Sequence, residues 1–167
     1  GADGKPTGIT SLASLGQAMQ TIKDKTGVTP AAFSTNQDPA TLWRMWYSLF
    51  LQSGGTMYKD GKLYLNDLDT KGKAALQTMA DWTKAGYLTK NTAYPAAVAL
   101  FTAGRTAMMF NGNWEVPTMV DAKAKGTIKF DYGIMAFPKL AGASQTWADS
   151  HTLAIPNNTK TPMRCLL

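Results

Sequence analysis

The sequence predicts an α/β domain that is rich in helix and built around a small sheet. Stretches with apolar residues at helical spacing alternate along the chain with short apolar runs, a pattern typical of strands connected through helices. The length of 167 residues and the apolar fraction of 44% are sufficient for one domain with its own core. We therefore expect residues 1–167 to form a single domain.

The N-terminal part predicts a helix followed by a strand. Leucine, methionine and isoleucine recur at helical spacing from Leu12 onward until Gly27 ends the helix, and Ser14 with Gln17 is a candidate capping box. The next apolar run, VTPAAF at residues 28–33, is typical of a short buried strand.

The clearest helix follows the polar loop STNQDP. Asp38 is a candidate N-cap, and Pro39 takes the first helical position, where its missing N–H group costs little. One face of this helix carries Leu42, Met45, Trp46, Leu49, Phe50 and Ser53. Gly54-Gly55 is expected to end it.

A hairpin and another helix come next. Asp60-Gly61 is a turn dipeptide between the short strands expected at residues 57–58 and 63–65. The spacing then predicts a helix over residues 70–85, which Gly86 ends. The residues expected to point inward from this helix are Ala75, Leu76, Met79 and Trp82.

The second half of the chain begins with a short helix from Pro95 to Gly104 and a strand at residues 105–110. Proline fits the first turn of a helix but not a later position, so Pro117 places the start of the next helix near Val116. This leaves residues 111–115, NGNWE, as the corner between strand and helix.

Two further strands are expected near the C-terminal end. The first is KFDYGIMAFP at residues 129–138, and the second is HTLAIP at residues 151–156. The polar loop KLAGASQTWADS joins them.

Composition excludes several classes of function. The net charge of +6 would suit a nucleic-acid partner, but the lysines are scattered without a dense basic run, so we expect no nucleic acid. No apolar run approaches the ~20 residues of a membrane span. The single cysteine, Cys165, excludes an internal disulfide, and the single histidine, His151, excludes a cluster or triad built from two histidines. We expect no cofactor and no metal site.

Three polar stretches share one chemistry. They are residues 34–39, the corner at residues 111–115, and the loop that carries Gln145, Trp147 and Asp149. Each combines planar amide or carboxylate groups with a tryptophan in it or within one helical turn of it. A sugar requires this combination, because its hydroxyls bind amide and carboxylate groups while its C–H faces stack on flat apolar surfaces. In α/β sheets, ligands bind outside the carboxyl ends of strands, where two of these stretches are expected.

The stretch FTAGRTAMMFNGNWEV resembles a signature of the extracytoplasmic solute-binding proteins that feed ABC importers, in particular the maltose/oligosaccharide-type family. The family pattern F-x-x-G-[KR]-x-A-M-x-x-x-G-x-W is matched at Phe101, Gly104, Arg105, Ala107, Met108, Gly112 and Trp114. The NQDP loop with the aromatic helix after it, and the segment TLAIPNNTK, also resemble parts of this family. The similarity runs from about Thr10 to Lys160.

This resemblance implies one lobe of a periplasmic-binding-protein type II fold, the second lobe of a two-lobed protein that closes on its ligand. It implies a first lobe before Gly1 and further helices after Lys160, with residues 161–167 as an atypical tail. The implied function is non-catalytic: the protein binds a sugar or oligosaccharide and delivers it to the membrane subunits of an ABC transporter. The implied location is extracytoplasmic, either periplasmic or anchored on the cell exterior.

The resemblance also assigns binding roles. Trp114 would be the stacking platform, Asp38 a carboxylate that binds hydroxyls, and Trp43 or Trp46 a second aromatic wall. The other members of the predicted binding set come from the same three stretches and are Gln37, Asn113, Glu115, Trp147 and Asp149.

Several of these residues have a purely structural alternative. Trp114 and Trp46 are also consistent with core packing, Asp38 with a helix cap alone, and Glu115 with a favourable interaction with the helix dipole. Arg44 is more typical of a solvated or lobe-bridging residue than of an anion clamp.

Two other functions stay open on the sequence. A glycoside hydrolase would use two of Asp38, Glu115 and Asp149, and it requires two opposed carboxylates at a defined separation, one with a raised pKa. An adhesion or scaffold domain would use the aromatic residues for contact with proteins.

Overall fold

The computed structural model describes residues 8–36, 38–150 and 158. The elements, in order, are α1 (Leu12–Thr26), β1 (Thr29–Ala32), α2 (Pro39–Gln52), β2 (Tyr58–Lys59), β3 (Lys62–Leu63), α3 (Lys73–Lys84), α4 (Tyr94–Thr102), β4 (Thr106–Met109) and α5 (Val116–Ala124). A π-helical turn at Leu68–Gly72 precedes α3, and a 3-10 turn at Asn113–Glu115 precedes α5. The helix-rich α/β class with a small sheet is confirmed. The strand expected at residues 151–156 lies outside the described residues.

The central sheet pairs β1 and β4 in parallel, with Thr29 opposite Thr106 and Ala31 opposite Met108. β1 also has a second neighbour, because Ala31 forms an isolated parallel bridge with Leu88. Because parallel strands run in the same direction, the segments after β1 and β4 leave the sheet at the same edge. The sheet therefore brings together two of the three polar stretches that the sequence singled out.

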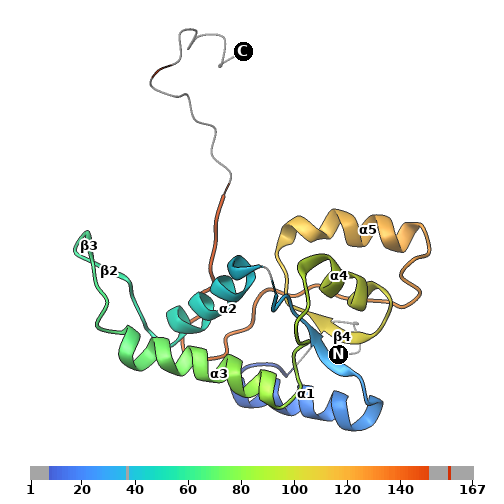
Figure 1. The fold of residues 1–167 in the computed structure, drawn as a ribbon, viewed down its shortest axis with the longest axis horizontal. Coiled ribbons are helices and arrows are strands. Elements are labelled where there is room, and N and C mark those ends of the chain that lie inside the picture. Colours follow the sequence, from blue (N-terminus) through green and yellow to red (C-terminus); the bar gives the residue numbers. More distant parts are fainter. Residues whose placement is uncertain (1–7, 37, 151–157, 159–167) are drawn as a thin grey trace.

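The helices cover the two faces of this sheet. Figure 1 shows α1 and α3 on one side of the strands and α4 and α5 on the other. Neighbouring strand residues point to opposite faces, so that Ala31 and Phe33 join one hydrophobic cluster and Ala32 joins the other. The larger cluster also takes residues from α1, α2 and α3, namely Leu15, Met19, Met45, Leu49, Phe50, Ala75, Met79 and Trp82. The smaller cluster adds Ala97, Phe101, Met119 and Ile128.

The capping box of α1 lies three residues earlier than predicted. The N–H group of Ser14 donates to Oγ of Ser11 (3.1 Å), and the N–H group of Ser11 donates to Oγ of Ser14 (2.9 Å). The N–H group of Leu12 donates to the carbonyl of Leu140 (3.0 Å), a partner far along the chain that fixes the first turn. The C-terminal end was predicted correctly, since Gly27 adopts a left-handed conformation with φ +69°.

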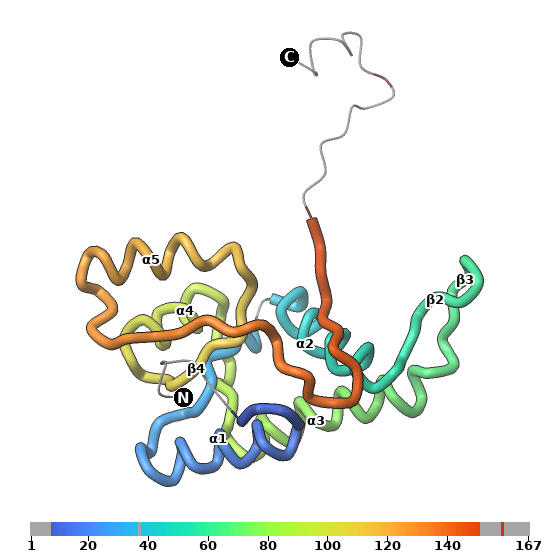
Figure 2. The backbone as a smooth tube through the Cα atoms, turned by 180° about the vertical axis from the view of Figure 1, so that it is seen from behind, coloured from blue at the N-terminus to red at the C-terminus, as the bar shows by residue number. Residues whose placement is uncertain are grey.

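Both ends of α2 and the hairpin after it follow the prediction. The N–H group of Thr41 donates to Oδ1 of Asp38 (3.2 Å), which caps the helix. β2 and β3 pair antiparallel around Asp60 (φ +51°) and Gly61 (φ +74°), two positive φ angles that suit a type I′ turn. Figures 1 and 2 show this hairpin projecting away from the rest of the fold; we call it the arm.

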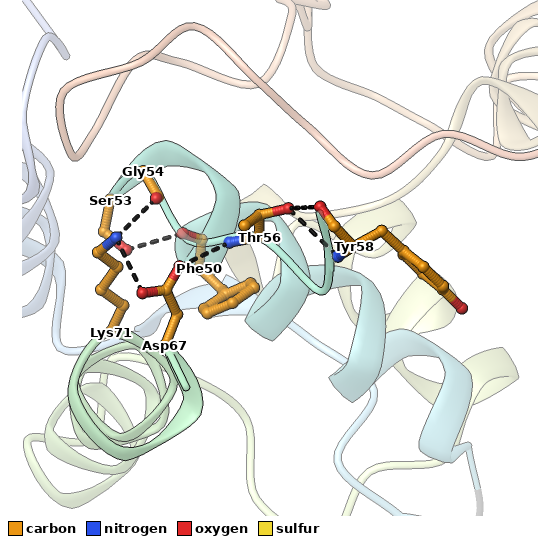
Figure 3. A network of polar contacts seen from close by, with 7 residues as sticks. All are labelled: Phe50, Ser53, Gly54, Thr56, Tyr58, Asp67 and Lys71. Atoms are coloured by element: carbon orange, nitrogen blue, oxygen red, sulfur yellow. Dashed lines mark hydrogen bonds and ion pairs between the residues drawn. The ribbon is translucent and has the colours of Figure 1, made fainter. Parts of the chain in front are cut away.

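The arm is held at its base by a compact polar network, which we call the arm foot (Figure 3). Asp67 accepts the N–H group of Thr56 (3.1 Å) and pairs with Nζ of Lys71 (3.2 Å). Lys71 also donates to the carbonyl of Gly54 (2.7 Å). Gly55 packs against the ring of the buried Phe50, since a Cβ at this glycine would lie 2.3 Å from a ring carbon.

α3 has the predicted core residues with one exception. Trp82 is buried as expected, but Leu76 is exposed, so its predicted inward orientation is wrong. α3 begins at Lys73 after the π turn rather than at residue 70. Leu76 instead lines a shallow hollow of about 320 Å³ with Lys73, Gln77 and Ala80.

The segment at residues 129–138 is not a strand, in contrast to the prediction. A strand needs a neighbour with which to exchange backbone hydrogen bonds, and this segment pairs with no strand in the described part of the chain. Aromatic side chains hold it instead: Phe130 packs edge-on against Phe101 (5.7 Å), and Phe137 lies 6.3 Å from Phe110.

Gln52 fixes the continuation of this segment. Its buried side-chain amide donates to the carbonyls of Pro138 and Gln145 (both 2.9 Å), and its oxygen accepts the N–H groups of Leu140 (2.7 Å) and Ala141 (3.1 Å). Four bonds from one glutamine thus attach the segment before Trp147 to the end of α2.

No helix in the described ranges is both long and apolar enough to span a membrane.

Candidate functional site

The candidate site lies where β4 turns into α5. After Met109 the chain passes through Asn111-Gly112, makes the 3-10 turn and enters α5 at Val116, as Pro117 predicted. Trp114, in the middle of the 3-10 turn, is 44% exposed. The indole therefore lies at the surface at the carboxyl edge of the sheet.

Two contacts fix the orientation of this indole. Its Nε1 donates to the hydroxyl of Tyr94 (2.8 Å), which stands at the start of α4. Its six-membered ring packs against Gly112, where an added Cβ would come within 2.1 Å of a ring carbon. Position 112 therefore requires glycine, because any side chain there would displace the indole ring of Trp114.

A buried acid lies behind the tryptophan. Glu115 is 9% exposed, and its carboxylate forms a short hydrogen bond with the Tyr94 hydroxyl. The same hydroxyl lies 3.0 Å from Oδ1 of Asn111. Burial, and then the hydrogen bond with Glu115, raise the pKa of Tyr94 above its ordinary value of 10.0. Tyr94 therefore stays neutral at physiological pH and connects Trp114 to Glu115.

A cation lies between two tryptophans. The guanidinium carbon of Arg44, on α2, is 4.7 Å from the ring centroid of Trp114 and 4.7 Å from that of Trp147. Asp149 lies 3.9 Å away from Nη2 of the arginine. The backbone N–H group of Trp147 donates to Oγ of Ser48 (2.9 Å), which positions this tryptophan over α2. We call Arg44, Tyr94, Trp114, Glu115, Trp147 and Asp149 the corner cluster.

An aromatic row continues along α2 from the surface to the core. Trp43, 43% exposed, stacks on Tyr47 with centroids 5.3 Å apart, and Trp46 stacks on the buried Phe50 at the same centroid separation. Nε1 of Trp46 donates to the carbonyl of Gly72 (2.9 Å). Trp46 is therefore anchored between α2 and the π turn before α3, whereas Trp43 offers open surface.

The other predicted residues occupy different positions. Asp38 binds the N–H group and the hydroxyl of Thr41 through both carboxylate oxygens, which is its role as a cap. Asn113 is exposed beside Trp114. Gln37 lies outside the described residues. The structure thus joins Trp114, Glu115, Trp147 and Asp149 in one cluster, while Asp38, Trp43 and Trp46 belong to α2 alongside it.

Tyr94 had no predicted role, and Arg44 was predicted to be solvated or lobe-bridging. Tyr94 carries a weak signal, because an aromatic residue with a polar tip stands directly before Pro95 at a helix start. For Arg44, the only signal in the sequence is its position next to Trp43. Chemically, the corner cluster combines an oriented indole with a cation, and the exposed amides of Asn111 and Asn113 lie beside it; such a set is suited to binding a polar ring.

Comparisons with known proteins identify the family and the fold of this chain. A family model described as bacterial extracellular solute-binding protein matches residues 2–166. Among solved structures, a chitin oligosaccharide binding protein matches with a TM-score of 0.68 and 24% sequence identity. The match covers 81% of this chain but only 35% of the other, so the chain spans about a third of that protein's length. Since the family model covers nearly the whole chain, this chain belongs to the bacterial extracellular solute-binding proteins.

Proposed function

We propose that this chain binds a sugar or oligosaccharide, without changing it chemically, for delivery to the membrane subunits of an ABC transporter outside the cytoplasm. The observation that carries the proposal is the exposed indole of Trp114, held in one orientation by Tyr94 and Gly112. A fixed aromatic surface lowers the ordering cost of binding, which is useful for stacking against the C–H face of a sugar ring.

Polar groups around this indole complete the proposed site. Asn113 and Asn111 are exposed next to Trp114, and Asp149 is 53% exposed across from Arg44. Amide and carboxylate groups of this kind bind sugar hydroxyls. Trp43 would form the second wall, because it is the tryptophan of α2 with open surface. Asp38 and Gln37 would contribute from the loop before α2.

The solute is proposed to lie between this chain and a first lobe of the same protein. Ile134 (63% exposed) and Met135 (40% exposed) lie in the extended segment that lacks a partner strand among the described residues, which supports a covering surface supplied from elsewhere. The match to about a third of a longer binding protein supports the same arrangement. Closure would follow from tighter binding of the ligand to the closed state.

A glycoside hydrolase is the second candidate, and the described carboxylates disfavour it. Such an enzyme needs two acids that face each other across a substrate. Asp38 is engaged by Thr41, and Glu115 is buried against Tyr94. Of the three acids considered, Asp149 has the most exposed side chain, at 53%, and no second acid is shown facing it across a substrate among the described residues.

A ligand screen on the intact protein tests the proposal. Thermal shift with mono- and oligosaccharides should find at least one that raises the melting temperature, and titration calorimetry should then give saturable binding. Ligand recovered unchanged after long incubation supports a binding protein, whereas cleaved products would establish the hydrolase. A protein that responds to no saccharide but captures other proteins would instead support the adhesion alternative.

A further inference from the structure

We propose that this site selects sugars that carry a carboxylate, and that Arg44 is the residue that recognises it. The inference rests on the proposed function and names the class of its ligand as uronic-acid-containing oligosaccharides. It follows from three features: which charges at the site remain available, how the guanidinium is held, and how weakly it is paired.

Arg44 is the cation of this site, and the exposed Asp149 beside it is the one acid that is not held by a close partner. Asp38 bonds to Thr41 through both oxygens, and Glu115 is buried and bonded to Tyr94. Neither carboxylate therefore faces a ligand unpaired. The positive charge of Arg44, by contrast, is 30% exposed between the two tryptophans.

The way in which Arg44 is held leaves its hydrogen-bonding edges available. The guanidinium carbon lies over the ring of Trp114 and over that of Trp147, 4.7 Å from each centroid. A guanidinium donates its five hydrogen bonds in its own plane, so stacking partners do not satisfy them. Nε is buried and has no hydrogen-bond partner among the described residues, so a ligand would meet the guanidinium at its Nη groups. The stacked arginine thus has an unmet demand for an acceptor.

The partner present meets little of this demand. Asp149 lies 3.9 Å from Nη2, longer than the 2.7–2.9 Å typical of a charge-assisted hydrogen bond, and its side chain is 53% exposed. A carboxylate on a bound sugar would match the planar donors of the guanidinium in pairs, a geometry that a single hydroxyl cannot reproduce. Arg44 would then discriminate acidic sugars from neutral ones.

Calorimetric titration of the intact protein tests this inference. Trisaccharides of glucuronic, galacturonic and mannuronic acid are compared with the neutral hexose trisaccharides of the same linkage. We expect at least one acidic trisaccharide to bind about tenfold or more tightly than its neutral counterpart, since a hydrogen bond between charged groups is stronger than one between neutral groups. This preference should weaken at high ionic strength.

Variants assign the preference to Arg44. Arg44→Gln should reduce it to twofold or less, and Arg44→Lys, which keeps the charge but not the paired donors, should give an intermediate value. Arg105→Gln is the matched control, because it removes the same charge from an exposed residue at the start of the turn into β4. Asp149→Asn should increase the preference by removing the competing acid, and it also tests the inference if Arg44→Gln does not fold.

The outcomes separate this inference from the proposed function. Neutral sugars that bind as well as or better than acidic ones in every pair would overturn the selection and leave sugar binding intact. A preference for acidic sugars that survives Arg44→Gln would overturn the role of Arg44. A protein that binds no saccharide of either kind would overturn the proposed function itself.

Discussion

The arm foot and the corner cluster each lie beside a glycine that packs against an aromatic ring, and each carries charged side chains, but they satisfy their polar groups differently. At the arm foot, Asp67 and Lys71 bind each other and backbone groups at 2.7–3.2 Å (Figure 3). In the corner cluster, Nε of Arg44 has no hydrogen-bond partner within the described part of the chain, and Asp149 lies 3.9 Å from Nη2. The ring beside the glycine is buried at the foot, in Phe50, and exposed at the corner, in Trp114.

This difference indicates different roles. Polar groups that satisfy one another stabilise a fixed shape and have little capacity left for a ligand. A preformed cluster with unused donors and an exposed ring has that capacity, at some loss of stability. We therefore expect changes at the arm foot to affect mainly folding, and changes at the corner to affect mainly binding.

The largest effect is expected for Gln52→Leu, because this side chain attaches the segment before Trp147 to the end of α2. The substitution leaves the backbone groups of residues 138, 140, 141 and 145 without their side-chain partner. A buried group left unsatisfied costs about 1–3 kcal/mol. Only the bond to the N–H group of Leu140 is fully buried, and water can compensate in part at the other three, so we expect a total loss of about 3–5 kcal/mol in the free energy of unfolding. Denaturant unfolding of the intact protein measures it. The neighbouring Ser53→Ala is the control and should cost less than about 1 kcal/mol; equal losses for both would contradict the role given to Gln52.

Trp114→Ala is expected to weaken ligand binding at the corner cluster and to leave the fold intact. Removal of an exposed, oriented indole should lower the affinity for the bound saccharide about 100-fold, as for the dominant residue of a binding site. The free energy of unfolding should fall by less than about 1 kcal/mol, since the ring contributes little to either hydrophobic cluster. Calorimetry gives the affinity and thermal melting the stability. Tyr58→Ala, on the exposed arm, is the control and should leave affinity unchanged; if Trp114→Ala also leaves it unchanged, Trp114 is not the platform.

Local signals in the sequence predicted much of the frame that holds this site. The cap at Asp38, the turn at Asp60-Gly61 and the helix start imposed by Pro117 all depend on residues within a few positions of one another. Backbone preferences of this kind depend on neighbouring residues, so they can be predicted from the sequence without knowledge of the fold. The carboxyl-edge corner at Trp114 was placed in this way.

The details of the site depend on contacts between distant segments. The four bonds of Gln52 reach residues more than 80 positions away, and the sandwich of Arg44 joins α2 to two separate loops. No periodicity encodes such contacts. The incorrect strand at residues 129–138 has the same origin, because alternating apolar residues favour a strand only where a neighbouring strand is present.

A matched pair of glycine substitutions compares the two regions directly. A Cβ at Gly55 would lie 2.3 Å from the ring of the fully buried Phe50, and a Cβ at Gly112 would lie 2.1 Å from the ring of Trp114. Phe50 cannot move without disturbing the core, so Gly55→Ala should cost about 2 kcal/mol of stability and leave affinity intact. The exposed indole can move, so Gly112→Ala should lower affinity with little loss of stability. Thermal melting gives the stability of both variants, and calorimetric titration gives their affinity. Equal losses of stability would contradict the assignment of Gly55 to folding and of Gly112 to binding.

The smallest effect is expected for Asp67→Asn at the arm foot. The asparagine keeps one oxygen to accept the N–H group of Thr56 but loses the charge that pairs with Lys71 at 3.2 Å. Lys71 is 37% exposed and retains its bond to the carbonyl of Gly54, so water and that carbonyl compensate for most of the lost pair. We expect a loss below about 1 kcal/mol that disappears in 1 M salt, where charges are screened over about 3 Å. Urea unfolding at low and high salt measures this loss. If the free energy of ligand binding changes by more than the free energy of unfolding, the arm foot belongs to the binding site.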